Sequence, residues 1–386
     1  MKLFYSSIFL VLATSFYACK KTQNTEKAQV QINATLSDKL IKYSDIIDSA
    51  SYIKLETDSS FVIGNIDKLL FEDQKLFIMD RSLSESIFVF DEKGKFLTKI
   101  NKKGQGPGEF VEIRDFTIDT AKKQVVLLDL KGRKINFYDY TGRYLTSSKI
   151  PFLFSEFACI NTNAFAFSTA AANNSHNKKI KNNSLIIGKI NGEVKRVLFP
   201  FQTWELSFSY FNQQHLRSFG NKTFYYPRYS NKIYQLSADS LKLIYNIDLE
   251  KNGIPEDKMD HITDQNFREL TKTYTVFDGN YVDLAEGACF TINTPEGNFN
   301  LFYSKKSGNI KYSKAYLIDN PLFNFIGSPV TSYRDKFMVS TVKAHHILQQ
   351  KNILLKDGGK QLVKALFSGL TEDSNPVIFL YRFKSF

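Results

Sequence analysis

The stretch from Gly104 to Phe110 (Gly-Gln-Gly-Pro-Gly-Glu-Phe) has residue types that could form a phosphate-binding loop. Such loops present consecutive backbone N–H groups and usually end in Gly-Lys-Ser/Thr at the start of a helix. This sequence has neither that ending nor a helical pattern behind it, and Pro107 lacks one backbone donor. We therefore interpret the stretch as a tight turn, in which glycine permits positive φ angles.

Asp80 and Asp129 are carboxylates at equivalent places in two consecutive similar segments. They could form a metal site or an acid/base pair, and Asn280 and Glu286 could add further oxygens. Alternatively, each aspartate accepts hydrogen bonds from the amides of its own turn, which is what repetition of a structural role predicts. We favour the turn interpretation and predict neither a metal nor another cofactor.

Histidine and cysteine give little sign of nucleophilic or metal chemistry. His176, His215 and His261 lie in polar segments without a serine or cysteine signature, so we expect them at the surface. Cys159 and Cys289 lie in apolar stretches without ligand spacing, which favours buried thiols, although pairing between them stays open. No catalytic residue is assigned.

Tyr225, Tyr226, Arg228 and Tyr229 form an aromatic and cationic group. Such a group could stack on a sugar or bind a carboxylate. The alternative is ordinary strand packing of the tyrosines with a solvated arginine. These four residues are the candidate ligand-binding residues.

The formal net charge of +12 raises the possibility of nucleic-acid binding. The lysines are scattered through turns instead of gathered on one element, which favours a solvated surface. We expect no nucleic-acid partner.

Short apolar runs separated by turn residues must position these groups. Leu76–Asp80 followed by Ile87–Leu97 closely resembles Val125–Asp129 followed by Ile135–Leu145. A repeat of about fifty residues built from short strands indicates a propeller. We predict an all-β, six-bladed β-propeller with short helical inserts, its blades centred on about 68–100, 115–146, 156–198, 218–247, 286–317 and 329–384.

Ser51–Leu55 is placed to supply the outer strand of the last blade and so to close the ring. Weak helical periodicity predicts an insert at about 255–274 and a helical hairpin at about 344–370 within the last blade.

The N-terminal residues resemble an export signal. Lys2 precedes an apolar run, and Ala18 precedes Cys19, so residues 1–18 are interpreted as a lipoprotein-type signal peptide. Cys19 is then the lipidated first residue of the mature chain. Residues 19–37 are predicted to be a flexible tether and 38–386 the propeller.

Three stretches carry a resemblance to a known family: Gly104–Phe110, Tyr226–Leu236 and Glu372–Tyr381. From about Ser51 to Lys384 the chain resembles the six-bladed β-propeller lipoproteins of Bacteroidetes, relatives of the NHL-repeat propellers. Where a full NHL repeat has Asp, Asn and Arg, this chain keeps Asp80-Arg81 and Asp129 with Arg133. The resemblance implies a lipid-anchored protein of the bacterial cell envelope, on its periplasmic or surface face.

Two functions follow as expectations. The first is a non-catalytic envelope lipoprotein whose propeller binds a glycan, a peptide or a partner protein. The alternative is a propeller hydrolase or lyase with a polar or metal-bearing axial site.

Overall fold

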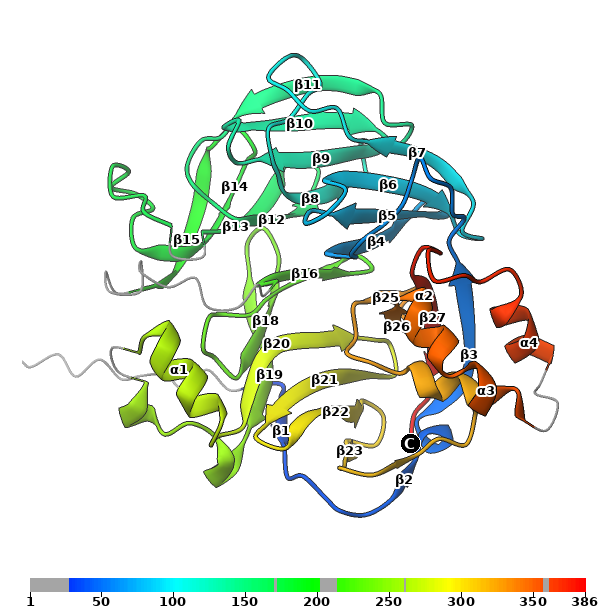
Figure 1. Cartoon of the computed structure of the whole chain (residues 1–386). Coiled ribbons are helices and arrows are strands. Elements are labelled where there is room, and N and C mark those ends of the chain that lie inside the picture. Colours follow the sequence, from blue (N-terminus) through cyan, green and yellow to red (C-terminus); the bar gives the residue numbers. More distant parts are fainter. Residues whose placement is uncertain (1–27, 170–171, 202–213, 260–261, 357–360) are drawn as a thin grey trace, which may run out of the picture.

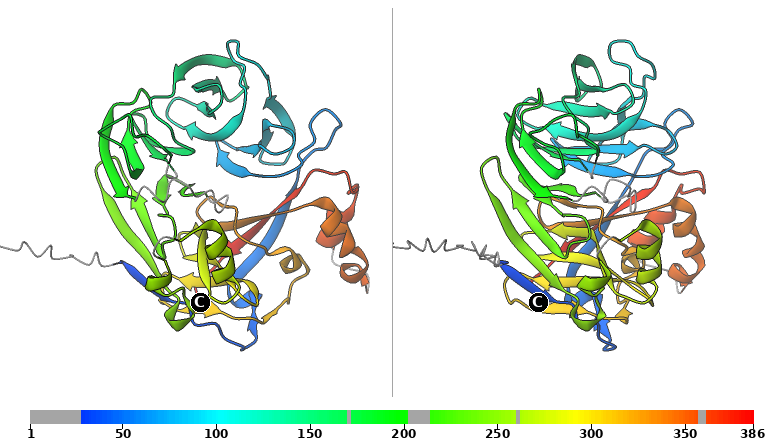
Figure 2. Two further views of the ribbon diagram at one scale, coloured as in Figure 1. Left: turned by 60° about the vertical axis from the view of Figure 1, so that its left-hand side comes forward. Right: turned by 90° about the vertical axis from the view of Figure 1, so that its left-hand side faces the viewer.

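Six antiparallel sheets stand in a ring in the computed structural model of the chain (Figures 1 and 2). The structure describes residues 28–169, 172–201, 214–259, 262–356 and 361–386. First strands of neighbouring blades contact one another, so these strands line the axis. The prediction of a six-bladed β-propeller is confirmed.

Each blade contributes four strands, which run in order from the axis outward. Blade 1 contains β4 (Lys68–Glu72), β5 (Lys75–Asp80), β6 (Ser86–Asp91) and β7 (Phe96–Ile100); blade 2 contains β8 (Ile113–Asp119), β9 (Gln124–Asp129), β10 (Lys134–Asp139) and β11 (Tyr144–Lys149). Blade 3 contains β12 (Glu156–Asn161), β13 (Ala164–Ser168), β14 (Asn183–Gly188) and β15 (Val194–Pro200); blade 4 contains β16 (Leu216–Phe219), β17 (Lys222–Tyr225), β18 (Lys232–Leu236) and β19 (Leu241–Asp248). Blade 5 contains β20 (Val276–Asp283), β21 (Gly287–Thr294), β22 (Gly297–Ser304) and β23 (Ile310–Tyr312); blade 6 contains β25 (Thr331–Tyr333), β26 (Phe337–Val342), β27 (Val377–Phe383) and β3 (Ile47–Lys54).

The core lies between the blades. In β5 and β9 every residue after the first is buried, because both faces of a middle strand pack against a neighbouring blade. In the outer strand β11 no residue is fully buried. Continuous apolar runs therefore mark the middle strands, while the outer strands carry a weaker pattern.

The inner strand of blade 5 begins earlier than the sequence analysis predicted. β20 occupies residues 276–283, whereas the predicted blade was centred on about 286–317. Asp278-Gly279-Asn280 is typical of a turn, yet the register of β20 with β21 shifts between Phe277 and Tyr281. Gly279 has φ +83°, and a Cβ there would lie 2.5 Å from the Tyr226 ring. The turn-like triplet is thus a bulge within a strand.

The ring closes through the N-terminal part of the chain, as predicted. β3 pairs antiparallel with β27, with Ser51 opposite Leu380. The Asn375 side chain reinforces this closure: it accepts from the Ile63 N–H at 2.7 Å and donates to the carbonyls of Glu56 and Phe61.

The packed body starts before residue 38, which corrects the predicted tether boundary. β1 (Val30–Asn33) pairs parallel with β19, and Ile32 is fully buried. Ser37 then bridges to Ser313, and β2 (Ile41–Lys42) pairs with β24 (Tyr316–Leu317) before the one-turn helix η1 (Tyr43–Asp45). We call residues 28–46 the N-terminal strap. The strap alternates single apolar and polar residues over too few positions for a strand to be recognised in this polar segment. The predicted signal peptide and Cys19 lie outside the described residues.

Short helices occupy the connections. Between blades 4 and 5 lie η3 (Glu250–Asn252), η4 (Glu256–Lys258) and α1 (Asp264–Thr271), and η5 (Pro321–Phe325) precedes blade 6. Within blade 6 lie α2 (Ala344–Gln349), α3 (Lys351–Leu354) and α4 (Gln361–Phe367). Lys54 on β3 donates to the carbonyls of Ala365 and Ser368, so α4 packs on the outer edge of blade 6 (Figure 1).

Candidate functional site in the axial channel

Charged side chains from the inner strands join successive blades around the axis. Lys68 Nζ in blade 1 donates to Asp115 Oδ1 in blade 2 at 2.8 Å, and both side chains are buried. The Phe157 N–H in blade 3 donates to the other oxygen of Asp115 at 2.9 Å. Asp115 is therefore satisfied by a lysine and a backbone amide from its two neighbouring blades.

Glu156 continues these contacts from blade 3 to blade 4. Its Oε2 accepts from the backbone N–H groups of His215 at 2.7 Å and Leu216 at 3.1 Å. Burial raises the pKa of Glu156 to about 7, and the carboxylate of Asp115 adds to the increase. This carboxyl group therefore titrates near neutral pH.

His215 is buried, which corrects the expectation of a surface position. Its ring stacks on Tyr226 at 5.9 Å, and its Nδ1 lies 2.9 Å from the Tyr226 carbonyl oxygen. Burial lowers the pKa of His215 to about 4, and Arg228 acts in the same direction. The imidazole is neutral at neutral pH, and its polar flanking sequence gave no signal of its burial.

Arg217 extends the contacts from blade 4 to blade 5. Its Nη1 donates to the Tyr281 carbonyl at 2.9 Å and its Nη2 to Asn280 Oδ1 at 2.7 Å. Hydrogen bonds and ion pairs thus connect the inner strands from blade 1 to blade 5. Asn280, a spare metal-ligand candidate in the sequence, serves as the acceptor for this arginine.

A cavity of about 520 Å³ lies at the end of the axis where the inner strands finish. We call it the strand-end cavity. Its floor includes Thr117, Thr223, Thr331 and Ser332, which are each 4–7% exposed. Further lining residues are Leu70, Phe71, Glu72, Ile118, Asp119, Thr120, Ala121, Cys159, Ile160, Asn161, Thr162, Ser218, Gly220 and Asn221.

A second cavity of about 380 Å³ lies where the inner strands begin, lined among others by Asp67, Gln214, Arg217 and Asp278. Gln214 Nε2 donates across the ring to the Asp67 carbonyl at 2.8 Å. Along β4, Lys68 stands between residues of this cavity and Leu70 of the strand-end cavity. The charged contacts therefore occur between two cavities on one axis.

Two of the four predicted ligand-binding residues are packing residues instead. Tyr225 and Tyr226 are each 1% exposed, and the Tyr226 hydroxyl donates to the Phe277 carbonyl at 2.9 Å. A ring buried to this extent cannot stack on a ligand, so the assignment was wrong for these two. Tyr225 packs against blade 3 and Tyr226 against blade 5, and local sequence does not show such contacts between blades.

Arg228 and Tyr229 are half-buried beside α1. The Arg228 guanidinium lies over the Tyr229 ring at 5.3 Å, and that ring packs on Phe267 at 5.2 Å. Their predicted role in ligand binding stays a prediction.

The glycine stretch is a turn between blades 1 and 2, as predicted. Glu109 Oε2 accepts from the Gly106 N–H at 2.9 Å, so the loop's own carboxylate occupies one of its amides. Phe110 is fully buried, and Lys103 contacts Glu85 and the Val111 carbonyl. The loop is fixed by internal contacts.

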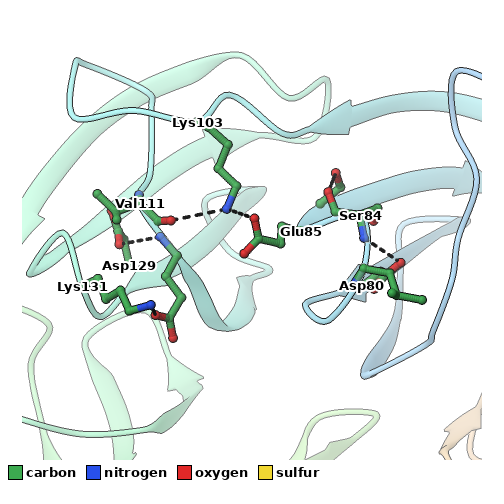
Figure 3. A network of polar contacts seen from close by, with 10 residues as sticks. Asp80, Ser84, Glu85, Lys103, Val111, Asp129 and Lys131 are labelled. Atoms are coloured by element: carbon green, nitrogen blue, oxygen red, sulfur yellow. Dashed lines mark hydrogen bonds and ion pairs between the residues drawn. The ribbon is translucent and has the colours of Figure 1, made fainter.

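Asp80 and Asp129 cap turns, as the favoured interpretation predicted. Asp80 accepts from the N–H groups of Gly64, Leu83 and Ser84. Asp129 accepts from those of Val111, Glu112 and Gly132 (Figure 3). Each carboxylate thereby fastens the chain entering a blade to the turn after its second strand. Within the described ranges no group of three or more His, Cys, Asp or Glu could hold a metal ion.

Cys159 and Cys289 are both free thiols and do not pair. Cys289 is fully buried, whereas Cys159 lines the strand-end cavity and donates to the Asn161 carbonyl at 3.3 Å. Burial raises the pKa of Cys159 to about 12, with Asp119 adding to the increase, so the thiol is not an activated nucleophile.

The lining residues of the strand-end cavity were missed by the sequence analysis. They lie on five different blades, so no local motif contains them. The available signal was threonine and serine at inner-strand positions, as in Thr117 and Thr331, where the middle strands have apolar residues.

These features define a six-bladed β-propeller with a cavity at each end of its axis. The chain belongs to the family described as Domain of unknown function (DUF4934), whose model matches residues 27–382. No curated protein matches the chain.

Solved structures resemble the chain in fold. A Bacteroides fragilis protein with the name "Putative exported protein" matches with a TM-score of 0.74 and 15% identity, over 92% of this chain and 99% of that chain. A DUF4221 family member from Bacteroides vulgatus matches with a TM-score of 0.46 and 8% identity, over 88% of this chain and 98% of that chain. Within the described residues, no helix has the length and apolar character needed to cross a membrane.

Proposed function

We propose that this chain is an exported, non-catalytic binding module of the bacterial cell envelope, with its ligand in the strand-end cavity. The observation that carries the proposal is a cavity of about 520 Å³ on the propeller axis, walled by inner strands from five blades. Its volume suits a small molecule or the end of a chain-like ligand. Strands and the tight turns that follow them hold the lining groups in place, which lowers the entropic cost of binding.

The proposed location rests on the N-terminal sequence. Residues 1–18 have the pattern of a lipoprotein signal, and Cys19 would carry the lipid. The similarity to a Bacteroides protein named for export agrees with this. The segment from residue 20 to the start of the strap would then link the propeller to the membrane.

The axial carboxylates support binding over hydrolysis. Asp115 is occupied on both oxygens by Lys68 and the Phe157 N–H. Glu156 accepts two backbone N–H groups on one oxygen. Because these bonds hold neighbouring blades together, the pair has a structural role that explains its position.

Thiol labelling of Cys159 tests the proposal. The mature chain with Cys19→Ser is treated with a small neutral methanethiosulfonate at pH 8.5, where the raised pKa makes labelling slow, with and without fractionated envelope extract. Cys289 is fully buried, so Cys159 is the one of the two described cysteines that the reagent should label. Protection by an extract fraction is expected, and unchanged labelling with every glycan, peptide and protein fraction contradicts the proposal.

A further inference from the structure

Half of the residues that line the strand-end cavity carry side chains that both donate and accept hydrogen bonds. Its hydroxyl groups belong to Thr117, Thr120, Thr162, Ser218, Thr223, Thr331 and Ser332, and its amides to Asn161 and Asn221. Asn221 and Asn161 are exposed at the rim, while Thr117, Thr223 and Thr331 are buried at the floor. A ligand that matches such a lining must itself carry many groups that donate and accept.

The charge of the cavity opposes that of the whole protein. Its lining contains Glu72 and Asp119 but neither lysine, arginine nor histidine, although the chain has a net charge of +12. Asp119 is already paired with Lys122 at 3.2 Å. Glu72 is the remaining carboxylate, and burial raises its pKa. A phosphate or carboxylate ligand would meet no lining cation here.

An aromatic wall leads out of the cavity into a side groove. The rings of Phe71 and Tyr333 lie 4.6 Å apart at 42°, and both are half-buried. Phe71, Glu72 and Gly220 line both the strand-end cavity and an adjoining groove of about 260 Å³. Glu92 in this groove accepts from the Tyr333 hydroxyl and from Arg334, which fixes the ring. The groove gives an elongated ligand room to continue past the wall.

We propose that the strand-end cavity binds the end of a neutral saccharide, with Glu72 accepting hydrogen bonds from sugar hydroxyls and the Phe71–Tyr333 wall against a sugar face. Sugar hydroxyls supply the required donors and acceptors, and the apolar face of a pyranose ring packs on aromatic rings. The inference rests on the proposed function and names its ligand class.

Calorimetric titration of the mature Cys19→Ser chain tests the ligand class. The probes are neutral disaccharides of glucose, galactose, mannose and xylose, a digalacturonate as the anionic sugar, and spermidine as a hydroxyl-free cation. We expect at least one neutral disaccharide to bind and to protect Cys159 from labelling, and the digalacturonate to bind at least roughly tenfold more weakly. Binding of spermidine alone, or of no neutral sugar, overturns the inference.

Variants locate the site. Asn221→Ala, at the exposed rim, should weaken sugar binding by roughly fivefold or more, as loss of one hydrogen bond predicts. The matched control is Asn163→Ala, because Asn163 is an exposed asparagine in the turn after β12 that does not line the cavity. Equal affinities of these two variants contradict the proposed place of binding.

The Glu72→Gln variant distinguishes a sugar ligand from a cationic ligand. It keeps the shape and one acceptor, so sugar affinity should fall by roughly fivefold, whereas affinity for a cationic ligand should be lost. Thr223→Val probes the floor with nearly unchanged volume and should also weaken sugar binding.

The labelling experiments distinguish failure of the ligand class from failure of the proposed function. If extract fractions protect Cys159 while the neutral disaccharides do not, the ligand class is wrong and the proposed function stands. If neither protects Cys159, both proposals fail.

Discussion

Glu156 and His215 are neighbours whose protonation equilibria change stability in opposite directions. The pKa of Glu156 is raised from 4.5 to about 7, so the folded protein keeps a proton that the unfolded chain loses. Its contribution to stability therefore falls as pH rises from 4.5 to about 7. The pKa of His215 is lowered from 6.5 to about 4, so its contribution falls as pH drops from 6.5 to about 4. Over the shared interval the two trends largely cancel.

Removing either group should expose the pH dependence of the other. For Glu156→Gln we expect the free energy of unfolding to rise between pH 4 and 6.5, and for His215→Gln to fall between pH 4.5 and 7. The change should total on the order of 3 kcal/mol, since each pKa is shifted by about two and a half units and one unit corresponds to about 1.4 kcal/mol. Urea denaturation at each pH measures this. The nearby charges of Lys68, Asp115, Arg217 and Arg228 stay the same in both variants, and curves parallel to that of the unaltered protein would contradict the argument.

Gly108 and Gly308 allow backbone strain to be separated from crowding. Their φ angles are +74° and +75°, but a Cβ at Gly108 would lie 2.8 Å from Tyr144 Cβ, while one at Gly308 would meet nothing within 4 Å. Gly308→Ala should cost about 1 kcal/mol from the φ angle alone. Gly108→Ala should cost about 2–4 kcal/mol because of the added contact. Thermal unfolding of both variants measures the difference, and equal losses would show that Tyr144 moves aside freely.

Residue roles were predictable where they depend on local sequence. The capping of turns by Asp80 and Asp129 followed from their repetition and is confirmed. The burial of His215 and Tyr226 was not predictable, because it depends on contacts between blades: His215 bonds Glu156 of blade 3 and stacks on Tyr226, which packs on Phe277 of blade 5.

The N-terminal strap is the element that the sequence analysis described least well. It runs along the outer side of blade 4, then blade 5, before β3 enters blade 6 (Figure 1). It covers the outer edge of blade 4, where β19 would otherwise present unpaired backbone groups. The strap also fixes where the N-terminal part of the chain joins the propeller.

Ile32→Ala tests whether the strap contributes to stability. Ile32 is fully buried against blade 4, so its truncation should cost about 2–4 kcal/mol. Asn33→Ala is the control, because Asn33 is the next residue and is exposed. Chemical denaturation should show a lower midpoint for the first variant only. Equal midpoints would mean that the strap is loosely attached.

The ring of six blades is held by one closure. Blade 6 takes its outer strand β3 from near the N-terminus and its other strands from the C-terminal region. Separating β3 from β27 would leave a long unpaired edge and disconnect the contacts between the first and last blades. Unfolding should therefore begin at this closure.

A disulfide across the closure should stabilise the protein more than one inside a blade. Ser49 and Arg382 are exposed register partners in β3 and β27, and Lys134 and Lys149 are register partners within blade 2. Ser49→Cys with Arg382→Cys closes a far longer loop than Lys134→Cys with Lys149→Cys. The chain-entropy model gives about 3 kcal/mol more stabilisation for the longer loop. Denaturation of the oxidised and reduced forms of each double variant measures this stabilisation. A larger stabilisation by the disulfide within blade 2 would contradict the claim that unfolding begins at the closure.

The class of fold, the repeat, the closing strand and the turns were predictable from the sequence alone, because they depend on short-range patterns of apolar, turn and β-branched residues. Ser51–Leu55 was recognisable as the closing strand because an unclosed ring requires one. The place where a ligand could bind, in contrast, emerged only from the packing of the blades. The strand-end cavity collects Glu72, Thr117, Asn161, Asn221 and Ser332 from five separate blades, and their proximity depends on how the blades pack around the axis. Packing likewise buried Tyr225 and Tyr226, since the same residue types suit a core and a binding surface equally well.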